Sequence, residues 1–264
     1  MKIGFIGCGN MATAMIGGIL ESGVVSEADI MASDKVPSAQ KKITEELKIQ
    51  YGETNQAVAE FADVLFLAVK PQYYAEVIAE IKYSITVKEV IVTIAPGKTL
   101  DWLGQQFGRP LKIVRTMPNT PAMVKAGMMG MSKNENVAPD EMEMVQTLCR
   151  SFGRAEWVPE GLLDVVTAVS GSGPAYVFMM IEAMADGAVA DGMPRAQAYE
   201  FAAQAVYGSA KMMLELGKHP GELKDMVCSP GGTTIDAVRV LEERGFRSAL
   251  IEAEKACVKK AKKL

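Results

Sequence analysis

Hydrophobic and polar positions change period repeatedly along residues 1–158 of the chain. Short apolar runs typical of buried strands alternate with stretches whose apolar residues recur at helical spacing. This alternation predicts an α/β fold, a Rossmann domain with a doubly wound, mostly parallel sheet. The expected strands are 2–6, 29–33, 63–69, 88–94, 112–115, 127–131 as an edge strand, and 155–158.

Helices are expected between these strands. Residues 37–47 and 139–152 have an amphipathic pattern, and Gly23 is the expected end of the first helix. Asn55 precedes another short helical segment and has a side chain suited to an N-cap. We therefore expect Asn55 to cap that helix.

The strand pattern disappears after Leu162. We place a boundary there between a dinucleotide-binding domain, residues 1–159, and an all-helical domain, residues 160–264. The helix expected over 175–190 is apolar on nearly all sides, which predicts burial. A helical domain of this size is too small to bury that helix, so a second copy of the chain is its expected cover.

A glycine turn lies between the first predicted strand and the first predicted helix. Strand, turn and helix in this order form the dinucleotide-binding pattern G-x-G-x-x-[GA], although an ordinary tight turn is the alternative. Gly7 permits the turn, Gly9 leaves room for a pyrophosphate, and Ala12 lets the helix pack closely. The N–H groups at the helix start would attract the phosphates. The expected cofactor-binding residues here are Ile6, Gly7, Cys8, Gly9, Asn10, Met11 and Ala12.

The residues after the second predicted strand stand about 20 positions past the glycines, where Rossmann proteins contact the adenosine ribose. The carboxylate of Asp34 would bind the 2′-hydroxyl of NAD. Ser33 and Lys35 would instead hold the 2′-phosphate of NADP. These features conflict, and they leave both cofactors open.

Two polar residues follow other strands at the expected ligand-binding edge of the sheet. Lys70 follows the most apolar strand, and a solvated charge at the strand end is the alternative explanation. Asn119 lies between Pro118 and Pro121, whose restricted backbones would aim its side chain in a fixed direction. Such a turn would contact the nicotinamide or the substrate, although the pattern alone favours a plain loop.

A second glycine-rich segment, Ser229–Thr234, precedes a helix near the C-terminus. Gly231 and Gly232 free its backbone, and Thr233 or Thr234 is expected to cap the helix. The helix N–H groups would form a seat for an anion such as a substrate carboxylate. A plain helix cap is the alternative that the pattern alone favours.

Charge and rare residue types limit the functional classes. A net charge of −4 and a pI near 5.3 argue against nucleic acid as a partner. The single histidine, His219, excludes a histidine-cluster metal site and a histidine-dependent triad, so no metal is expected. The four cysteines show no C-x-x-C spacing and are expected to be free thiols in the cytoplasm. No membrane span is expected.

Six segments carry a family resemblance. They are FIGCGNMATA at 5–14, DVLFLAVKPQ at 63–72, MPNTPA at 117–122, AVSGSGPAY at 168–176, HPGELKD at 219–225 and LKDMVCSPGGTTI at 223–235. Because the set runs nearly end to end, the chain closely resembles the pyrroline-5-carboxylate reductases. The resemblance implies NAD(P)H-dependent reduction of Δ1-pyrroline-5-carboxylate to L-proline, the last step of proline biosynthesis. It also implies a Rossmann domain joined to a helical domain that interlocks two subunits, giving a homodimer at least and a decamer of dimers as a larger assembly.

The resemblance also assigns roles by position. Ser33 and Asn55 would lie near the adenosine ribose with Asp34 and Lys35, and Glu160 would lie near the substrate. The substrate carboxylate would be held by Ser229, Gly231, Gly232, Thr233 and Thr234, supplied by the neighbouring subunit. The nicotinamide side would be formed by Ala68, Val69, Lys70, Pro71, Ala95, Pro96, Gly97 and Asn119.

The implied chemistry needs few specialised groups. A cyclic imine becomes strongly electrophilic once its nitrogen is protonated, so neither a metal nor an activated nucleophile is required. Thr234 is the best candidate to hydrogen-bond the ring nitrogen, and its weak acidity assigns it orientation rather than proton donation. The family usually prefers NADPH; Asp34 departs from that preference because its carboxylate should repel a 2′-phosphate.

Two other functions compete with this interpretation. β-Hydroxyacid dehydrogenases share the two-domain plan but resemble one another in a catalytic lysine preceded by Asn three residues earlier. Here Gly208 stands three residues before Lys211. A nucleotide-sensing regulator without turnover would need the first glycine turn but not the segment Ser229–Thr234.

Overall fold

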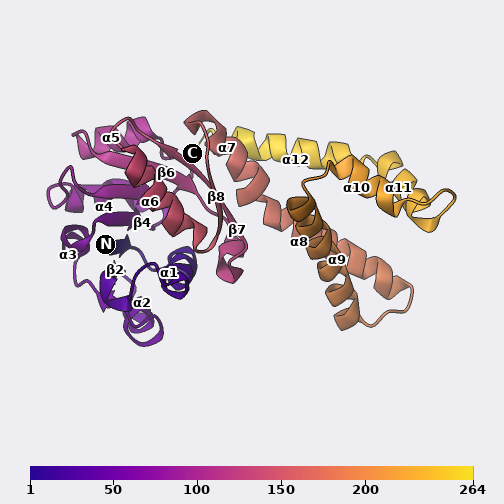
Figure 1. Ribbon diagram of the computed structural model, residues 1–264, viewed down its shortest axis with the longest axis horizontal. Helices are drawn as coiled ribbons and strands as arrows, with labels where there is room; N and C mark the ends of the chain where they lie inside the picture. The colour runs from indigo at the N-terminus through magenta and orange to yellow at the C-terminus, as the bar shows by residue number, and fades with distance from the viewer. Residues whose placement is uncertain (264) are drawn as a thin grey trace. The chain divides into compact units, whose positions relative to one another are not determined.

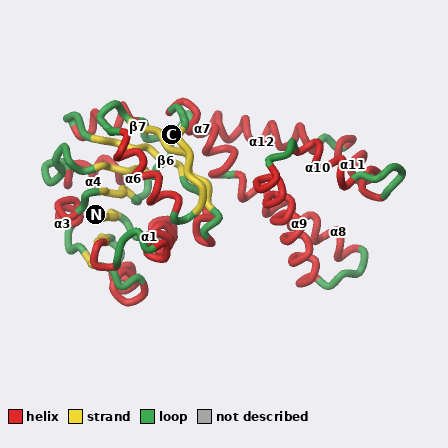
Figure 2. Tube along the Cα trace, viewed as in Figure 1, coloured by secondary structure: helices red, strands yellow, loops and turns green. Residues whose placement is uncertain are grey.

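The computed structural model describes residues 1–263 except the side chain of Gln40 (Figure 1). The chain forms two compact units. Unit 1 comprises Met1–Ser172 together with the chain from Cys257 onward, and unit 2 comprises Gly173–Ala256. Unit 1 contains a sheet covered by helices, and unit 2 is helical (Figure 2).

The sheet of unit 1 has eight strands in the order β3-β2-β1-β4-β5-β6-β7-β8. Every neighbouring pair is parallel except β6 and β7, which confirms the predicted doubly wound, mostly parallel fold. The strands are β1 (Ile3–Ile6), β2 (Ile30–Ser33), β3 (Gln50–Tyr51), β4 (Val64–Leu67), β5 (Val90–Thr93), β6 (Lys112–Met117), β7 (Gly127–Lys133) and β8 (Gly153–Trp157).

Two strands differ from expectation. The segment expected as an edge strand, β7, lies inside the sheet, because it pairs antiparallel with β6 and parallel with β8. The outer strand beyond β2 is β3, which the sequence did not predict. With two residues, β3 is too short to show an alternating pattern.

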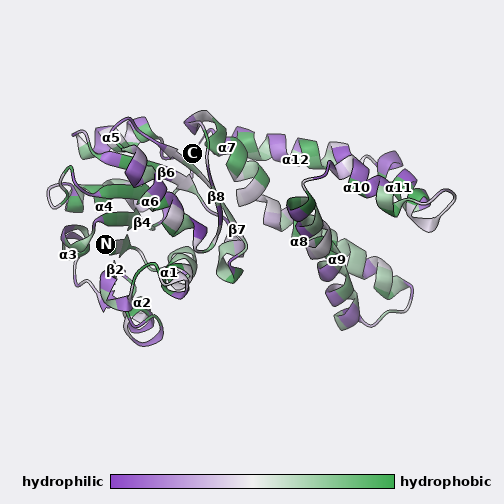
Figure 3. Ribbon diagram, in the orientation of Figure 1, coloured by the Kyte–Doolittle hydropathy of each residue, from purple (hydrophilic) through white to green (hydrophobic). Residues whose placement is uncertain are grey.

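Helices cover both faces of the sheet. The central strand β4 has the colour of hydrophobic residues in Figure 3. One hydrophobic cluster joins one strand face to α1, α2, the π-helix η2 and α6; the other joins the opposite face to α3, α4 and α5. At the centre of the first cluster, the rings of Phe5 and Phe66 stack with centroids 4.6 Å apart. The bounds are α1 (Asn10–Ser22), α2 (Pro37–Lys41), η2 (Lys42–Glu46), α3 (Asn55–Phe61), α4 (Tyr74–Ile81), α5 (Leu100–Phe107) and α6 (Pro139–Arg150).

Local capping explains the end of α1 and the start of α3. Gly23 adopts φ 71° after α1, as expected for a glycine that ends a helix. The N-cap of α3 is Thr54, whose hydroxyl accepts the Ala57 N–H at 3.1 Å, so the expectation of Asn55 as the cap was wrong. Asn55 is instead the first helical residue. Short helical turns complete unit 1: η1 (Glu27–Asp29), η3 (Pro71–Tyr73), η4 (Thr120–Val124), η5 (Glu160–Leu162), α7 (Leu163–Val166) and the π-helix η6 (Thr167–Gly171).

Unit 2 has almost no core of its own. Among its described helices, the fully buried residues are Ala185 on α8 and Ala198 and Ala202 on α9. Large apolar side chains such as Phe178 and Phe201 are 64% and 66% exposed. The helices are α8 (Gly173–Ala190), α9 (Arg195–Leu216), α10 (Pro220–Val227), α11 (Thr233–Glu243) and α12 (Phe246–Ala261), the last of which re-enters unit 1.

One helical stretch, Glu160–Ala190, is long and apolar enough to cross a membrane by length and composition alone, which the sequence analysis did not expect. In its most apolar 18-residue window, 11% is buried. Helices of soluble proteins can pass the same test, so this is weak evidence for a span. It does show that the stretch requires an apolar cover.

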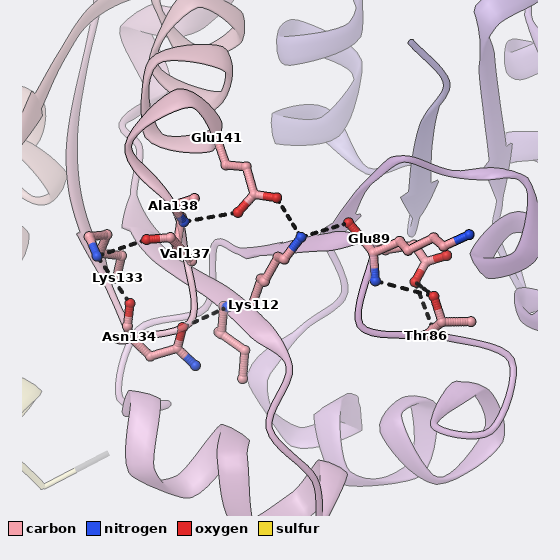
Figure 4. A network of polar contacts seen from close by, with 10 residues as sticks. Thr86, Glu89, Lys112, Lys133, Asn134, Val137, Ala138 and Glu141 are labelled. Atoms are coloured by element: carbon pink, nitrogen blue, oxygen red, sulfur yellow. Dashed lines mark hydrogen bonds and ion pairs between the residues drawn. The ribbon is translucent and has the colours of Figure 1, made fainter.

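A polar network ties the amino ends of β5 and β6 to α6 (Figure 4). The Lys112 ammonium pairs with the Glu141 carboxylate and donates to the Lys88 carbonyl at 3.3 Å. Glu141 also accepts the Ala138 N–H at 2.9 Å, which closes the N-terminus of α6. The network lies at the amino ends of the strands, on the edge of the sheet opposite to the glycine turn. We therefore assign it a role in stability rather than in binding.

Adjacent glycines on α1 give opposite stability predictions. A Cβ on Gly18 would lie 2.7 Å from the Phe152 Cβ and 2.9 Å from the Ser151 carbonyl oxygen, whereas Gly17 has no neighbour within 4 Å. Gly18→Ala should lower the free energy of unfolding by about 1–3 kcal/mol through overpacking. Gly17→Ala should raise it by about 0.5–1 kcal/mol through helix propensity. Urea unfolding checks both variants, and equal shifts would contradict the packing of α1 against Ser151 and Phe152, the two residues between α6 and β8.

Candidate active site

The carboxyl ends of five parallel strands meet at one edge of the sheet. Strands β1, β2, β4, β5 and β6 run in the same direction, so the segments that follow them gather at that edge. The strand order changes direction between β1 and β4, the topological switch point at which Rossmann folds bind ligands. The segments are 7–9, 34–36, 68–70, 94–99 and 118–119.

The turn after β1 requires glycine at its first position. Gly7 has φ 96°, and its N–H donates to the Ser33 carbonyl at 2.8 Å. A Cβ at Gly7 would lie 2.8 Å from the carbonyl of Ala68, the residue that follows β4. The turn is therefore fixed against both neighbouring strands by backbone contacts that exclude any side chain.

The next glycine faces open space. A Cβ added at Gly9 would meet no atom within 4 Å. Gly9 is also the N-cap of α1, whose start has no side-chain cap and no acidic residue in its first turn. The helix N–H groups and the positive end of its dipole are thus available to an anion. This arrangement fits the pyrophosphate of a dinucleotide, approached by the backbone.

The other predicted residues of this turn differ in exposure. Asn10 is exposed and Met11 half-buried. The side chains of Ile6, Cys8 and Ala12 are buried, so these three residues offer only backbone groups or packing. The Cys8 N–H is already used, because it donates to the Asp34 carboxylate at 2.7 Å.

A hydrogen-bonded chain follows β2. The Ser33 hydroxyl donates to the Asn55 side-chain oxygen at 2.7 Å, and the Asn55 amide donates to Glu80 on α4 at 2.5 Å. Asp34 turns toward backbone N–H groups, those of Cys8 and Val36, the latter at 2.9 Å. Ser33 and Asn55 are therefore in direct contact and Asp34 is the next residue along the chain, and their role in binding the ribose stays a prediction.

Lys35 is held by α4, the helix that carries Glu80. Its ammonium lies 2.6 Å from a Glu76 carboxylate oxygen and 3.9 Å from one of Glu80. The sequence analysis missed both glutamates, because no motif distinguishes them from ordinary polar positions on the amphipathic helix α4.

Tyr74, another residue that the sequence analysis missed, organises the segments that were predicted to form the nicotinamide side. Its buried hydroxyl donates to the Leu67 carbonyl at 2.5 Å and accepts the Ile94 N–H at 3.3 Å. Tyr74 thereby joins the ends of β4 and β5, and burial raises its pKa. The segments it positions contain the half-buried Ala68, Val69, Pro71, Pro96 and Gly97, the buried Ala95 and the exposed Lys70.

Asn119 and Glu160 make structural contacts. The Asn119 amide donates to the Ser170 carbonyl at 3.0 Å, and its oxygen accepts the Met128 N–H at 2.8 Å. A Glu160 carboxylate oxygen accepts the Leu100 N–H at 2.7 Å and a guanidinium N–H of the buried Arg115 at 2.9 Å. Glu160 thus ties α5, which follows the 95–97 segment, to β6.

The predicted substrate segment lies in unit 2, before α11. Gly231 adopts φ 66°, and the Gly232 N–H donates to the Ser229 carbonyl at 3.0 Å. The N-cap of α11 is Gly232 and no side chain caps the helix, so neither Thr233 nor Thr234 is the cap that we expected. Ser229, Gly231 and Thr233 are exposed and Thr234 is half-buried. This helix start can accept an anion.

The described residues include free thiols but no cluster of metal ligands. Among residues 1–263, no group of three or more His, Cys, Asp or Glu side chains could hold a metal ion. Cys8, Cys149, Cys228 and Cys257 are free thiols. Burial raises the pKa of Cys149 to about 12 and also raises that of Cys8, so neither is a thiolate at neutral pH.

Comparison with known families assigns both parts of the chain. Residues 160–264 match the family model "Pyrroline-5-carboxylate reductase dimerisation", and residues 2–97 match "NADP oxidoreductase coenzyme F420-dependent". The pyrroline-5-carboxylate reductase of Escherichia coli K12 is 54% identical over 263 residues, covering 100% of this chain and 98% of the relative.

Two solved structures are similar over the whole fold. A pyrroline-5-carboxylate reductase from Coxiella burnetii has a TM-score of 0.93 and 35% identity, covering 99% of this chain and 97% of the other. A pyrroline carboxylate reductase from Plasmodium falciparum, with NADP bound, has a TM-score of 0.89 and 29% identity with the same coverage.

The fold, the glycine turn and these matches define an NAD(P)-dependent oxidoreductase of the Rossmann class. More narrowly, the chain belongs to the pyrroline-5-carboxylate reductase family. Enzymes of this family catalyse the last step of proline biosynthesis with NAD(P)H. Family membership confirms the resemblance inferred from the six sequence segments.

The two glycines of the turn give separable predictions. Gly9→Ala should weaken NADP⁺ binding by about tenfold or more, because its Cβ enters the phosphate space, with a stability loss within about 1 kcal/mol. Gly7→Ala should mainly destabilise the fold, by about 1–3 kcal/mol, because of its φ and the Ala68 carbonyl. Calorimetric titration and urea unfolding separate the effects. Unchanged NADP⁺ affinity in Gly9→Ala would remove this turn from the site.

Tyr74→Phe tests the coupling of β4 and β5. The variant leaves the Leu67 carbonyl and the Ile94 N–H without their partner, which should cost about 1–3 kcal/mol of stability. Because these groups border the segments 68–71 and 95–97, kcat should fall more than KM for the cofactor rises. Steady-state kinetics check this. A loss of stability with unchanged kcat would give Tyr74 a purely structural role.

Proposed function

We propose that this chain binds NAD(P)H along the carboxyl edge of its sheet and reduces Δ1-pyrroline-5-carboxylate to L-proline there. The observation that carries the proposal is the open start of α1 at Gly9, placed at the topological switch point of a full-length member of this family. The cofactor residues are those named in the sequence analysis, from Ile6 to Asn119.

The nicotinamide supplies a hydride to the imine carbon when it is bound. The protein contributes position: Tyr74 fixes the spacing of the two segments that border the ring, and the backbone near Gly7 fixes the pyrophosphate. Thr234 orients the imine by a hydrogen bond to its nitrogen, which is already protonated and electrophilic. Its hydroxyl is too weakly acidic to act as the proton donor.

The substrate carboxylate binds at the start of α11, at Ser229, Gly231, Gly232, Thr233 and Thr234. Support comes from the uncapped helix start and the positive φ of Gly231, which free N–H groups for an anion. Glu160 contributes near the substrate by holding the N–H of Leu100, next to the 95–97 segment.

The active site is composite in this proposal: one subunit provides the cofactor edge and the neighbouring subunit provides the Ser229–Thr234 segment. The dimerisation model matches residues 160–264, and we take 159–160 as the functional boundary. A homodimer covers the exposed apolar side chains of unit 2 and much of the stretch Glu160–Ala190, in place of a membrane. A decamer of dimers, a cytoplasmic location and the lack of a nucleic-acid partner complete the proposal.

Initial rates test the activity directly. Oxidation of NADPH and of NADH is followed separately with pyrroline-5-carboxylate as the second substrate. Fast oxidation of either establishes the reductase. No oxidation together with intact cofactor binding supports a nucleotide sensor, and NAD(P)⁺ reduction by a 2- or 3-hydroxy acid supports a β-hydroxyacid dehydrogenase.

Thr234→Ala should lower kcat/KM for pyrroline-5-carboxylate by about 10²-fold, because the imine loses its orienting partner. The affinity for NADP⁺ should stay within about twofold, since α11 does not belong to the cofactor edge. Thr234→Ser keeps the hydroxyl and should restore most of the activity. Wild-type turnover in the alanine variant would exclude Thr234 from the site.

A further inference from the structure

The ribose end of the cofactor edge contains an ion pair whose partners come from two elements. Lys35 follows β2, and Glu76 lies in the first turn of α4. Their charged groups lie 2.6 Å apart, and their side chains are 65% and 55% exposed. The Glu76 carboxylate raises the pKa of Lys35, so the lysine is fully charged and paired at neutral pH.

Glu80 connects this pair to the ribose residues. One of its carboxylate oxygens lies 3.9 Å from the Lys35 ammonium, and the other accepts the Asn55 amide at 2.5 Å. Asn55 in turn accepts the hydroxyl of Ser33. Lys35, Asn55 and Ser33 are therefore bonded, directly or through one partner, to carboxylates of α4, whereas Asp34 is bonded to backbone N–H groups.

The charges around the ribose end of the cofactor edge disfavour an added anion such as a 2′-phosphate. Asp34, Glu76 and Glu80 supply three carboxylates around this end of the edge. Lys35 and Lys42 supply positive charge there, and the charge of Lys42 acts on the Cys8 thiol. A 2′-phosphate carries a charge of about −1.5 to −2 near neutral pH, whereas a 2′-hydroxyl is neutral and can donate a hydrogen bond.

We propose that Glu76 and Glu80 are specificity-determining residues that hold Lys35 against α4 and thereby reduce the preference for NADP(H) over NAD(H). The inference rests on the proposed function in assigning this edge to the adenosine ribose. A 2′-phosphate would have to compete with Glu76 for Lys35, so the lysine would only exchange one anionic partner for another. The 2′-hydroxyl of NAD(H) meets no such competition.

Glu76→Gln is the direct test, because it removes one charge and keeps a polar side chain of the same length. The dissociation constants of NADP⁺ and NAD⁺ are measured by calorimetric titration without substrate. NADP⁺ should bind about three- to tenfold more tightly than to the wild type, and NAD⁺ within about twofold. Glu80→Gln, which can still accept the Asn55 amide, should shift NADP⁺ in the same direction. The gain should shrink in high salt.

Lys35→Met resolves the mechanism in a double-mutant cycle. In the wild-type background it should weaken NADP⁺ binding less than in the Glu76→Gln background, since in the wild type the lysine is shared with Glu76. In the Glu76→Gln background it should abolish the gain. Equal effects of Lys35→Met in both backgrounds would overturn the proposal.

Glu21→Gln is the matched control. Glu21 is also an exposed carboxylate paired with a lysine, Lys125, but it lies near the far end of α1, about 15–20 Å along the helix from Gly9. An equal gain in NADP⁺ affinity in this control would assign the effect to net charge and overturn the proposal. Turnover of pyrroline-5-carboxylate with NADH in the same variants tests the proposed function separately. A loss of turnover would count against the proposed function, whereas the two dissociation constants would still test the role of Glu76 and Glu80.

Discussion

The close approach of the turn after β1 to the backbone after β4 is the contact on which the rest of the site depends. Gly7 lies so near the Ala68 carbonyl that a Cβ would be 2.8 Å away, and this approach sets where α1 begins. The start of α1 is then exposed at Gly9, between the residues after β2 that we predict to meet the ribose and the segments joined by Tyr74 after β4 and β5. These segments are neighbours because the parallel strands that precede them end at the same edge of the sheet, at the topological switch point.

The two units satisfy different physical requirements. Unit 1 buries hydrophobic clusters on both faces of its sheet and closes its edges with polar networks such as that of Lys112 and Glu141. Unit 2 buries little more than alanines and leaves residues such as Phe178 and Phe201 exposed. Unit 1 therefore has a core of its own, whereas the helices of unit 2 require another surface to cover them. In the proposed dimer, the same association that covers those helices also completes the active site.

The sequence predicted the features that have a local cause. The apolar strands, the glycine turn and Gly23 at the end of α1 follow from period and backbone freedom within a few residues. Strand partners have no such local cause, so the interior position of β7 was missed, and two residues were too few to indicate β3. Thr54 and Asn55 are both good N-caps, and only the folded geometry distinguishes them. Tyr74, Glu76 and Glu80 gain their roles from the way α4 packs beside other elements, which no motif within α4 indicates.

The claim that the site is shared between subunits is tested most directly by complementation. Gly9→Ala, defective in the cofactor edge, is co-expressed with Thr234→Ala, defective in the substrate segment, and mixed dimers are assayed for pyrroline-5-carboxylate reduction. A site built from two subunits predicts about a quarter of wild-type activity, because half of the dimers are mixed and each contains one intact site. Activity no higher than that of the two variants alone would contradict the composite site and place both parts in one subunit.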